Sequence, residues 1–372
     1  MGSRTVLLVV SGNCYSSTDW AHHTANLWRE MATEFDEFHI FARNADQRFA
    51  TVSRGNVYLH LIPRGPARML TFFVSSWWLP VVMFQVRPTH MQAQSPMHGG
   101  LAAVILGALF RVPVLLELHG EHYLRSGQVG RRTHRWFIRP TTRIAFKGAT
   151  KIRSLSAEMS HEILATYGRS AAEKVVEIGN RVDLDVFSPP KLDYAVGPVL
   201  NIVSVGALNN NKNQSSLIRD LVEAGVRCRL TLVGQGGLRD QLIAEAGALG
   251  LPLEIVGGLN HLELREVLNQ QDIYVHYSLS EAVSRAVLEA MAMGLPLIVS
   301  PGGFLGGIID SGANGIRLES TGPAEIAEAI STLSVESVRA RLGAAARLQI
   351  ERHHEWRSVF AEHRAALLSM ER

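Results

Sequence analysis

The most informative stretch of this 372-residue chain is residues 280–296, which read SEAVSRAVLEAMAMGLP. The apolar run 273–276 just before it predicts a buried strand, and the apolar spacing within it predicts a helix over residues 285–293. Gly294 and Pro296 end that helix, because glycine favours the left-handed turn after a helix and proline cannot continue one. A strand, a loop and a helix in this order are typical of parallel α/β sheets.

The same alternation extends in both directions along the chain. Parallel strands need long crossover connections, so alternating strands and helices predict parallel sheets covered on both faces. The prolines of residues 188–199 exclude a helix or an interior strand there. We therefore predict an α/β protein of two Rossmann-like, doubly wound domains joined by a linker at 188–199. Strands are expected at 5–10, 37–41, 57–61, 90–93, 112–118 and 151–154, and then at 201–205, 229–233, 253–256, 273–276 and 297–300.

Composition narrows the class of protein. A content of 47% hydrophobic and 19% charged residues excludes a disordered or fibrous chain. Cys14 and Cys228 cannot form a disulfide framework, and no CxxC or Cys/His cluster predicts a metal site. The apolar run 5–10 is too short for a secretory signal and reads as a strand. We expect a cytoplasmic protein that requires neither a metal nor a bound cofactor.

The net charge of +3 hides an asymmetry between the halves. Residues 1–190 carry 21 Lys and Arg against 14 Asp and Glu, whereas residues 191–372 carry 16 against 20. The segment 122–157 contains nine basic residues and no acidic one. Such a segment favours an anionic partner, namely lipid headgroups, nucleic acid or a phosphorylated substrate. A solvated basic helix face is the alternative interpretation.

Residues 70–86 form an uncharged segment with two tryptophans and three phenylalanines, bracketed by Arg68 and Arg87. Its length reaches the lower limit for crossing a bilayer, although Pro80 interrupts it. Tryptophan and phenylalanine beside basic residues also suit a helix that lies in the membrane interface. A membrane span, an interfacial helix and an ordinary buried helix are therefore three open interpretations.

Two carboxylates flank the start of the helix predicted at 285–293. The amides of residues 282–284 are expected at its N-terminus, where N–H groups without helical partners favour an anion. Glu281 suits this place if it binds hydroxyls beside a phosphate, and Glu289 lies about 12 Å along and about 80° around an ideal helix. Carboxylates so separated can hold both ends of a nucleotide-sugar. Alternatively, Glu281 is a partner of the helix dipole and Glu289 is a surface residue.

This stretch resembles the E-x7-E signature of the retaining glycosyltransferases of family 4, which have the GT-B fold. Residues 288–296 match that family's L-E-A-M-A-x-G-x-P pattern. The resemblance covers roughly residues 90–370. Other segments similar to the family's motifs follow in its order: 178–183 with Phe187, 203–206 with Lys212, 232–236, 271–275 and Trp356.

The resemblance implies two Rossmann-like domains facing across a cleft. Residues 1–187 would bind the acceptor, residues 200–354 the nucleotide-sugar donor, and the last helix, about 355–372, would pack back on the first domain. The implied catalytic residues are Glu281 on donor-sugar hydroxyls, Lys212 on the diphosphate and His119 near the donor sugar, although His119 alone reads as a strand-end residue. Glu289 would bind the ribose. The implied donor-binding set is Gly206, Lys212, Gly234, Glu281, Ala282, Val283, Ser284, Arg285 and Glu289.

The chain departs from the family pattern at several positions. Ala207 stands where the family commonly has an arginine, which removes a cation from the diphosphate site. We hypothesise that Arg285 or Arg181 replaces it. Gly12 and Asn13 occupy the place of the family's Gly-Gly loop, and we assign them, with Arg181, to the acceptor side.

By resemblance, transfer retains the anomeric configuration and the leaving phosphate takes the acceptor's proton; a covalent intermediate on Glu281 is the alternative. We expect a glycan or a lipid-diphosphate-linked acceptor at the inner face of the cytoplasmic membrane, with a soluble small acceptor as the competing possibility. An epimerase and a phosphorylase on the same fold are alternatives to the transferase activity itself. Residues 234–237 lack the GxGxxG spacing of NAD-binding proteins. No RNA-binding motif accompanies the basic segment, so we expect no nucleic-acid partner.

Overall fold

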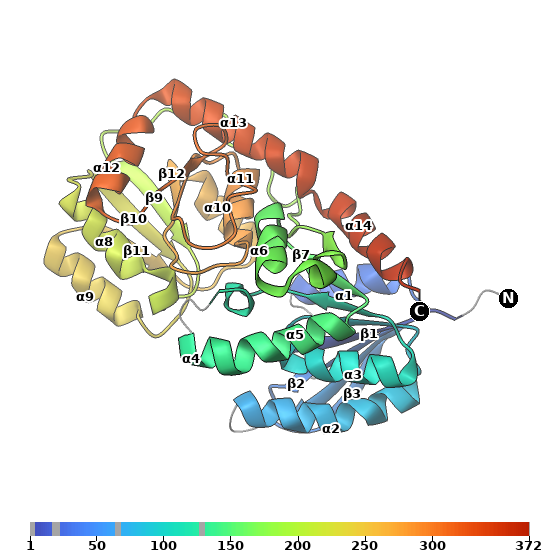
Figure 1. The fold of residues 1–372 in the computed structure, drawn as a ribbon. Helices are drawn as coiled ribbons and strands as arrows, with labels where there is room; N and C mark the ends of the chain where they lie inside the picture. Colours follow the sequence, from blue (N-terminus) through green and yellow to red (C-terminus); the bar gives the residue numbers. More distant parts are fainter. Residues whose placement is uncertain (1–3, 17–22, 64–67, 126–130, 372) are drawn as a thin grey trace. The chain divides into compact units, whose positions relative to one another are not determined.

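The computed structural model describes residues 4–16, 23–63, 68–125 and 131–371, which form two compact units (Figure 1). Unit 1 comprises residues 1–178 and 361–372, and unit 2 comprises residues 179–360. Each unit is an α/β structure on a mainly parallel sheet, which confirms the predicted fold class.

The sheet of unit 1 has eight strands in the order β3-β4-β2-β1-β5-β6-β7-β8. All neighbours are parallel except β3, which runs antiparallel to β4. Strands β3 and β8 are short, partly exposed and at the edges, and the sequence patterns did not predict them. The strands are β1 (Val6–Tyr15), β2 (Glu37–Asn44), β3 (Ala50–Arg54), β4 (Val57–Pro63), β5 (His90–Ala93), β6 (Val114–Glu117), β7 (Lys151–Ser154) and β8 (Val175–Glu177).

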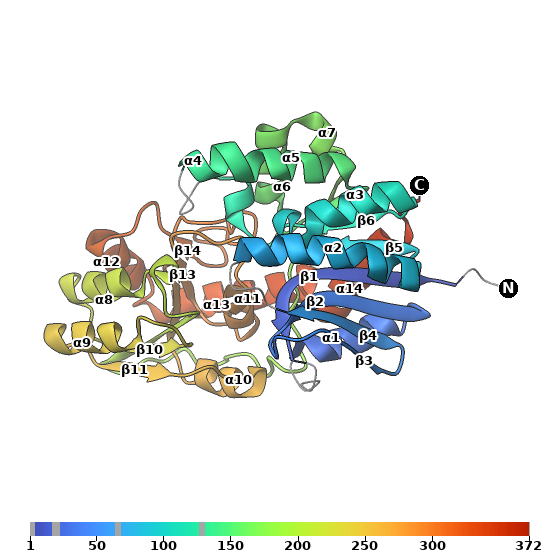
Figure 2. The ribbon, with the colours of Figure 1, turned by 90° about the horizontal axis from the view of Figure 1, so that it is seen from below.

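Helices cover both faces of this sheet. Helices α2, α3 and α5 lie side by side on one face (Figure 2), whereas α1 and the end of α14 pack on the other. The helical segments of unit 1 are α1 (His23–Ala32), α2 (Arg68–Val86), η1 (Pro96–Gly100), α3 (Leu101–Phe110), η2 (Glu121–Tyr123), α4 (Arg131–Thr133), η4 (His134–Ile138), α5 (Arg139–Gly148), α6 (Ala157–Tyr167), α7 (Arg169–Ala172) and the end of α14 (Trp356–Leu368).

Helix α2 contains the uncharged segment 70–86. In its C-terminal half, Leu79, Val82, Met83 and Val86 are buried, which is the i, i+3, i+4, i+7 spacing of a helix packed along one stripe. Among the helices in the described ranges, none combines the length and the apolar character needed to cross a bilayer.

The sheet of unit 2 has six parallel strands in the order β11-β10-β9-β12-β13-β14. Its strands are β9 (Leu200–Val205), β10 (Cys228–Val233), β11 (Leu253–Val256), β12 (Ile273–His276), β13 (Leu297–Val299) and β14 (Ile316–Arg317). Its helices are η5 (Asn210–Lys212), α8 (Gln214–Glu223), α9 (Arg239–Leu249), α10 (His261–Asn269), α11 (Arg285–Ala292), α12 (Pro323–Thr332), α13 (Glu336–His353) and the first part of α14.

Local sequence accounts for several helix ends in both units. The Ser156 side chain accepts a hydrogen bond from the Met159 amide at the start of α6. Asn260 and Glu263 form a capping box at the start of α10, and Gly250 ends α9 in the left-handed conformation. Signals within a few residues of each end therefore determine where these helices begin or end.

Residues 179–199 lie within unit 2, although the sequence analysis divided them between the first domain and a linker. The Asn180 side chain donates a hydrogen bond of 2.9 Å to the Val283 carbonyl. Lys191 Nζ donates one of 3.0 Å to the Gln271 carbonyl. Hydrogen bonds to residues 80 to 103 positions further along tie this irregular segment to the unit 2 core.

Candidate active site

The candidate site of unit 2 begins at the point where its strand order reverses. From β9 the chain proceeds outward to β10 and β11, and then returns to place β12 on the other side of β9. In open parallel sheets, the loops that follow two such strands diverge and leave room for a ligand beyond the carboxyl ends. The loop after β9 carries Lys212, and the loop after β12 carries Glu281.

Lys212 and Glu281 form an ion pair between Nζ and Oε2 in this structure. Both side chains are partly buried, so each charge loses part of its hydration and the other compensates for it. An ammonium carries three N–H donors, so the pair leaves Lys212 able to bind further acceptors. The structure therefore brings together two of the three residues predicted to be catalytic.

Asn211 joins the two loops that carry this pair. Its side chain donates a hydrogen bond of 2.8 Å to the Ser280 carbonyl, and its own carbonyl accepts one of 2.9 Å from the Leu279 amide. These bonds attach the residues next to Lys212 to those next to Glu281. The sequence analysis did not identify Asn211, because nothing in its neighbourhood indicates a partner 69 residues away.

Gly206 and Gly234 end β9 and β10 and allow the two loops to approach closely. A Cβ atom on Gly234 would lie 2.0 Å from the Gly206 carbonyl oxygen. A Cβ atom on Gly206 would lie 3.0 Å from Cε of Lys212. Both glycines, predicted as donor-binding residues, thus allow the backbone packing beneath the Lys212 side chain.

Helix α11 provides the second part of the site. Residues 282–284 are buried and precede its first residue, Arg285. Glu281 therefore lies in the loop before the helix, and the ideal-helix separation expected between Glu281 and Glu289 does not apply. Loop 282–284 is held by hydrogen bonds from Phe304 N to Ala282 O and from the Asn180 side chain to Val283 O.

Glu289 is buried within α11. Burial raises the pKa of its carboxyl group to about 7, and the nearby Arg285 lowers it only in part. Nε2 of His261 lies 3.7 Å from Oε1 of Glu289, and burial lowers the pKa of this histidine. The interpretation of Glu289 as an ordinary surface residue is therefore wrong.

His276 and Tyr274, on β12, are two further side chains of this site that the sequence analysis missed. Burial, together with the charge of Lys212, lowers the pKa of His276 to about 3, so its ring is neutral at pH 7. Its Nε2 atom lies 3.9 Å from Oε2 of Glu281. Burial and the two nearby carboxylates, Glu289 and Glu281, raise the pKa of Tyr274 well above its ordinary value. The apolar run 273–276 predicts a buried strand, but it does not show which polar atoms face the site.

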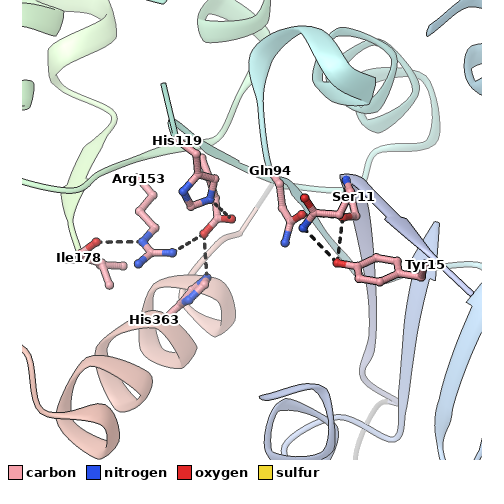
Figure 3. Close-up of polar contacts among 9 residues, drawn as sticks. Ser11, Tyr15, Gln94, His119, Arg153, Ile178 and His363 are labelled. Atoms are coloured by element: carbon pink, nitrogen blue, oxygen red, sulfur yellow. Dashed lines mark hydrogen bonds and ion pairs between the residues drawn. The ribbon is translucent and has the colours of Figure 1, made fainter. Parts of the chain in front are cut away.

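His119, the third predicted catalytic residue, lies in unit 1 just after β6 (Figure 3). Its Nε2 atom is 3.0 Å from Oε2 of the buried Glu117. Burial alone would raise the pKa of Glu117, but the charges of Arg153 and His119 hold it well below its usual range. The carboxylate is therefore ionised and accepts Nε2–H of His119, which orients the ring and leaves Nδ1 as its other polar atom.

Arg153 and His363 complete the surroundings of Glu117. Arg153 Nη1 is 2.5 Å from Oε1 of Glu117, and Arg153 Nε donates a hydrogen bond of 2.9 Å to the Ile178 carbonyl. His363, from α14, places Nε2 3.7 Å from the same carboxylate oxygen (Figure 3). Residues from β6, β7 and the C-terminal helix thus meet at one buried charge.

Gly12 and Asn13, assigned to the acceptor side, lie within β1 at an irregularity in its register between Val10 and Cys14. The Asn13 side chain donates a hydrogen bond of 3.1 Å to the Tyr15 hydroxyl. Ser11 Oγ donates one of 2.6 Å to the Gln94 side chain, which follows β5 (Figure 3). The expected glycine loop is replaced here by an extension of the strand with polar side chains at the strand order reversal of unit 1.

Arg181 and Arg285 were the two candidates to replace the missing family arginine at Ala207. The Arg181 guanidinium lies over the Trp356 ring, 4.7 Å from its centroid. Arg285 is exposed in the first turn of α11. Within the described ranges, no three His, Cys, Asp or Glu side chains are grouped as metal ligands would be.

Two curated relatives match two thirds or more of the chain. Glycogen synthase of Mycobacterium tuberculosis is 27% identical over 375 residues, which cover 95% of this chain and 84% of the relative. A GDP-mannose-dependent alpha-(1-6)-phosphatidylinositol dimannoside mannosyltransferase of the same organism is 29% identical over 286 residues, which cover 67% of this chain and 74% of the relative.

Solved structures share the fold. Anabaena Alr3699/HepE, determined in complex with UDP-glucose, superposes with a TM-score of 0.75 at 17% identity, covering 99% of this chain and 100% of that chain. A model for a glycosyl transferase 4-like domain matches residues 21–181, and the model for glycosyl transferases group 1 matches residues 198–349. With both family domains present in order on this fold, the chain belongs to the GT-B glycosyltransferases of family 4.

Proposed function

We propose that this glycosyltransferase moves a sugar from a nucleotide-sugar to a hydroxyl of a glycan or lipid-linked acceptor, in polysaccharide or glycoconjugate biosynthesis. The observation that carries the proposal is the Lys212–Glu281 pair beside the start of α11. A cation, a carboxylate and a set of backbone amides lie together at the carboxyl ends of β9 and β12. These groups match a diphosphate and the hydroxyls of the sugar attached to it.

The proposed reaction retains the anomeric configuration. The bond between the anomeric carbon and the diphosphate oxygen breaks, and the acceptor oxygen bonds to that carbon on the same face. The acceptor's proton passes to the departing phosphate oxygen. Lys212 and the amides of residues 282–284 stabilise the charge on the leaving group, so this scheme requires no metal.

The remaining donor contacts follow from the same assignment. In this proposal, Glu281 binds hydroxyls of the donor sugar, Glu289 binds the ribose and His119 reaches the donor sugar. Arg285 supplies the second cation for the diphosphate. We prefer Arg285 to Arg181 because Arg285 lies in the first turn of α11, whereas the Arg181 guanidinium is stacked on Trp356.

The names of similar proteins support the choice of donor and acceptor. Alr3699/HepE was determined with UDP-glucose, and one relative is named for GDP-mannose and a phosphatidylinositol mannoside. We therefore propose a UDP- or GDP-linked donor and a lipid-linked acceptor reached from the cytoplasmic side of the membrane.

A thermal-shift screen of UDP-, GDP- and ADP-sugars tests the donor assignment, because a ligand that binds only the folded state raises the melting temperature. We expect one nucleotide series to stabilise the wild-type protein and to lose its effect in Glu281→Ala. Glu254→Ala, which removes an exposed carboxylate of the same unit, is the matched control.

Mass spectrometry of products made with and without EDTA then tests the reaction. Transfer that persists in EDTA supports the scheme, and loss of transfer in EDTA contradicts the metal-independent step. Conversion of the donor without an acceptor would indicate an epimerase instead. A requirement for inorganic phosphate would indicate a phosphorylase.

A further inference from the structure

One helical face of unit 1 exposes large apolar side chains. It consists of α2, α3 and the segment from α4 to α5, and we call it the α2–α5 face (Figure 2). Trp77 and Phe84 of α2 are 82% and 68% exposed, Leu109 of α3 is 74% exposed and Trp136 of η4 is 73% exposed. Apolar groups gathered on adjacent helices mark an interaction surface more often than single exposed residues do.

Exposed aromatic side chains are concentrated on this face. Of the Phe and Trp side chains in the described part of the chain, all the exposed ones belong to unit 1. Phe49 is the one outside the face, and its ring packs 5.1 Å from that of Trp78. The exposed ones on the face are Trp77, Trp78, Phe84, Phe110, Trp136 and Phe137.

The charged groups between these side chains are all basic. The sequence from residue 47 to residue 157 contains two acidic residues, Glu117 and Glu121, and both are buried. No carboxylate therefore neutralises the α2–α5 face from its own helices. Its exposed basic residues are Arg87, Arg111, Arg131, Arg132, Arg135, Arg139, Arg143 and Lys147.

Some of these cations have structural roles as well. Arg87 and Arg111 directly follow α2 and α3, where a positive charge complements the helix dipole. Arg139 donates a hydrogen bond to the Thr166 carbonyl. Arg132 and Arg143 are exposed on α4 and α5, in the interior of the charged segment, and they provide a cleaner test of the charge on the face.

We propose that the α2–α5 face docks on an anionic lipid bilayer. Interleaved Trp, Phe, Leu and Arg side chains fit the boundary between headgroups and acyl chains, because the rings enter the apolar layer while the guanidinium groups stay with the phosphates. The buried stripe of α2, which includes Leu79 and Met83, fixes this helix on the sheet, so it lies on the membrane and does not cross it.

Lipid fits this face better than nucleic acid does. A nucleic-acid surface needs cations and stacking rings, but it gives no energetic return for exposing aliphatic groups such as Ile105, Leu109 and Ile144. Docking on the bilayer would give the enzyme access to a lipid-linked acceptor, and in this one respect the proposal rests on the proposed function. The interaction with the bilayer itself does not depend on the nucleotide-sugar.

Vesicle sedimentation provides the test. The protein is mixed with vesicles of phosphatidylcholine alone or of phosphatidylcholine with about 40 mol% phosphatidylglycerol, whose anionic headgroups give the surface a negative potential. We expect the protein to bind the anionic vesicles. Its apparent affinity should fall at least tenfold between 50 mM and 500 mM salt, because the Debye length shortens about threefold and the exposed charges are screened. Brominated acyl chains should quench tryptophan emission.

Matched variants distinguish this face from the rest of the protein. Trp77→Ser/Trp136→Ser should weaken quenching, which on this face Trp78 alone would then report, and Arg132→Glu/Arg143→Glu should reduce binding to anionic vesicles at least tenfold. The controls carry the same types of change on exposed residues of unit 2: Leu192→Ser/Leu262→Ser and Arg227→Glu/Arg352→Glu. All four variants should keep a melting temperature close to that of the wild-type protein, which shows that they are folded.

Several results would overturn the proposal. These are the absence of binding to anionic vesicles at 50 mM salt, equal binding by the face and control variants, or tighter binding to single-stranded DNA than to vesicles. A concentration-dependent doubling of mass that Trp77→Ser/Trp136→Ser abolishes would assign the face to a second copy of the chain. Failure of the donor screen alone leaves the vesicle result standing, so the two proposals fail separately.

Discussion

The Lys212 ammonium is paired with the Glu281 carboxylate, 69 residues further along the chain, where the strand order of unit 2 reverses. Both side chains are partly buried, and each charge compensates for part of the hydration that the other loses. The pair also holds one cation and one anion beyond the carboxyl ends of β9 and β12, where α11 begins. The pair is the feature on which the proposed chemistry rests.

Lys212→Ala should reduce kcat/KM for sugar transfer by roughly 100-fold or more, the usual effect of removing one group that stabilises developing charge. Steady-state kinetics with the donor found by thermal shift would measure it. Lys151→Ala is the control, because this lysine bonds to Ser369 on the surface of unit 1. Wild-type turnover by Lys212→Ala would remove the lysine from the mechanism.

Glu289→Gln should stabilise the protein above pH 7. The folded-state pKa of about 7 lies above the ordinary value of 4.5, so the folded state holds a proton that the unfolded state releases between these values. Stability therefore falls as pH rises through this window, by up to roughly 3 kcal/mol. Urea unfolding at pH 5 and pH 8 would show the gain at pH 8, and Glu254→Gln, an exposed control, should show none. An equal effect at both pH values would contradict the buried, protonated carboxyl group.

Nucleotide affinity should depend on the same proton. If the ionised Glu289 accepts hydrogen bonds from two ribose hydroxyls, affinity should fall about tenfold for each pH unit below about 7, because only the ionised form accepts both. Isothermal titration of UDP or GDP from pH 5.5 to 8.5 would measure this slope. Glu289→Gln should bind weakly and without that slope. A flat profile in the wild-type protein would argue against the ribose assignment.

Gly234→Ala should destabilise unit 2 by about 2 kcal/mol or more and weaken donor binding. Its φ of +148° is one that other residues rarely adopt, and the new Cβ would meet the Gly206 carbonyl oxygen at 2.0 Å. Gly237→Ala is the matched control, because a Cβ there meets no atom within 4 Å. Thermal melts with and without nucleotide would compare them. Equal stability of the two variants would show that the β9 and β10 loops need not approach so closely.

Glu117→Gln should destabilise unit 1 by about 3–5 kcal/mol, since it leaves the buried Arg153 guanidinium without its counter-charge. The depressed pKa of Glu117 means that its contribution is complete above about pH 4.5 and is lost as pH falls through the lower folded-state value. Urea unfolding at pH 7 and pH 3 would show the deficit of the variant shrinking in acid. Glu177→Gln, on the exposed edge strand β8, should change little at either pH.

Much of the fold could be read from local patterns. Strands such as β9, β10 and β12 were predicted within one or two residues, because apolar runs that end in glycine or precede a helix need only near neighbours to be recognised. The edge strands β3 and β8 were missed, because they are short and lack a buried face. Residues 179–187 belong to unit 2 through hydrogen bonds such as that from Asn180 to Val283, which no local pattern announces.

The candidate site divides in the same way. Residues 280–296 and Lys212 stand out in the sequence, since their residue types and order carry the family signature. Three properties belong to the folded chain: Lys212 meets Glu281, the pKa of Glu289 is raised to about 7, and a neutral His276 lies beside Glu281. They depend on strand order and burial, which arise from contacts between residues far apart in sequence, and a pattern of neighbouring residues carries no record of such contacts.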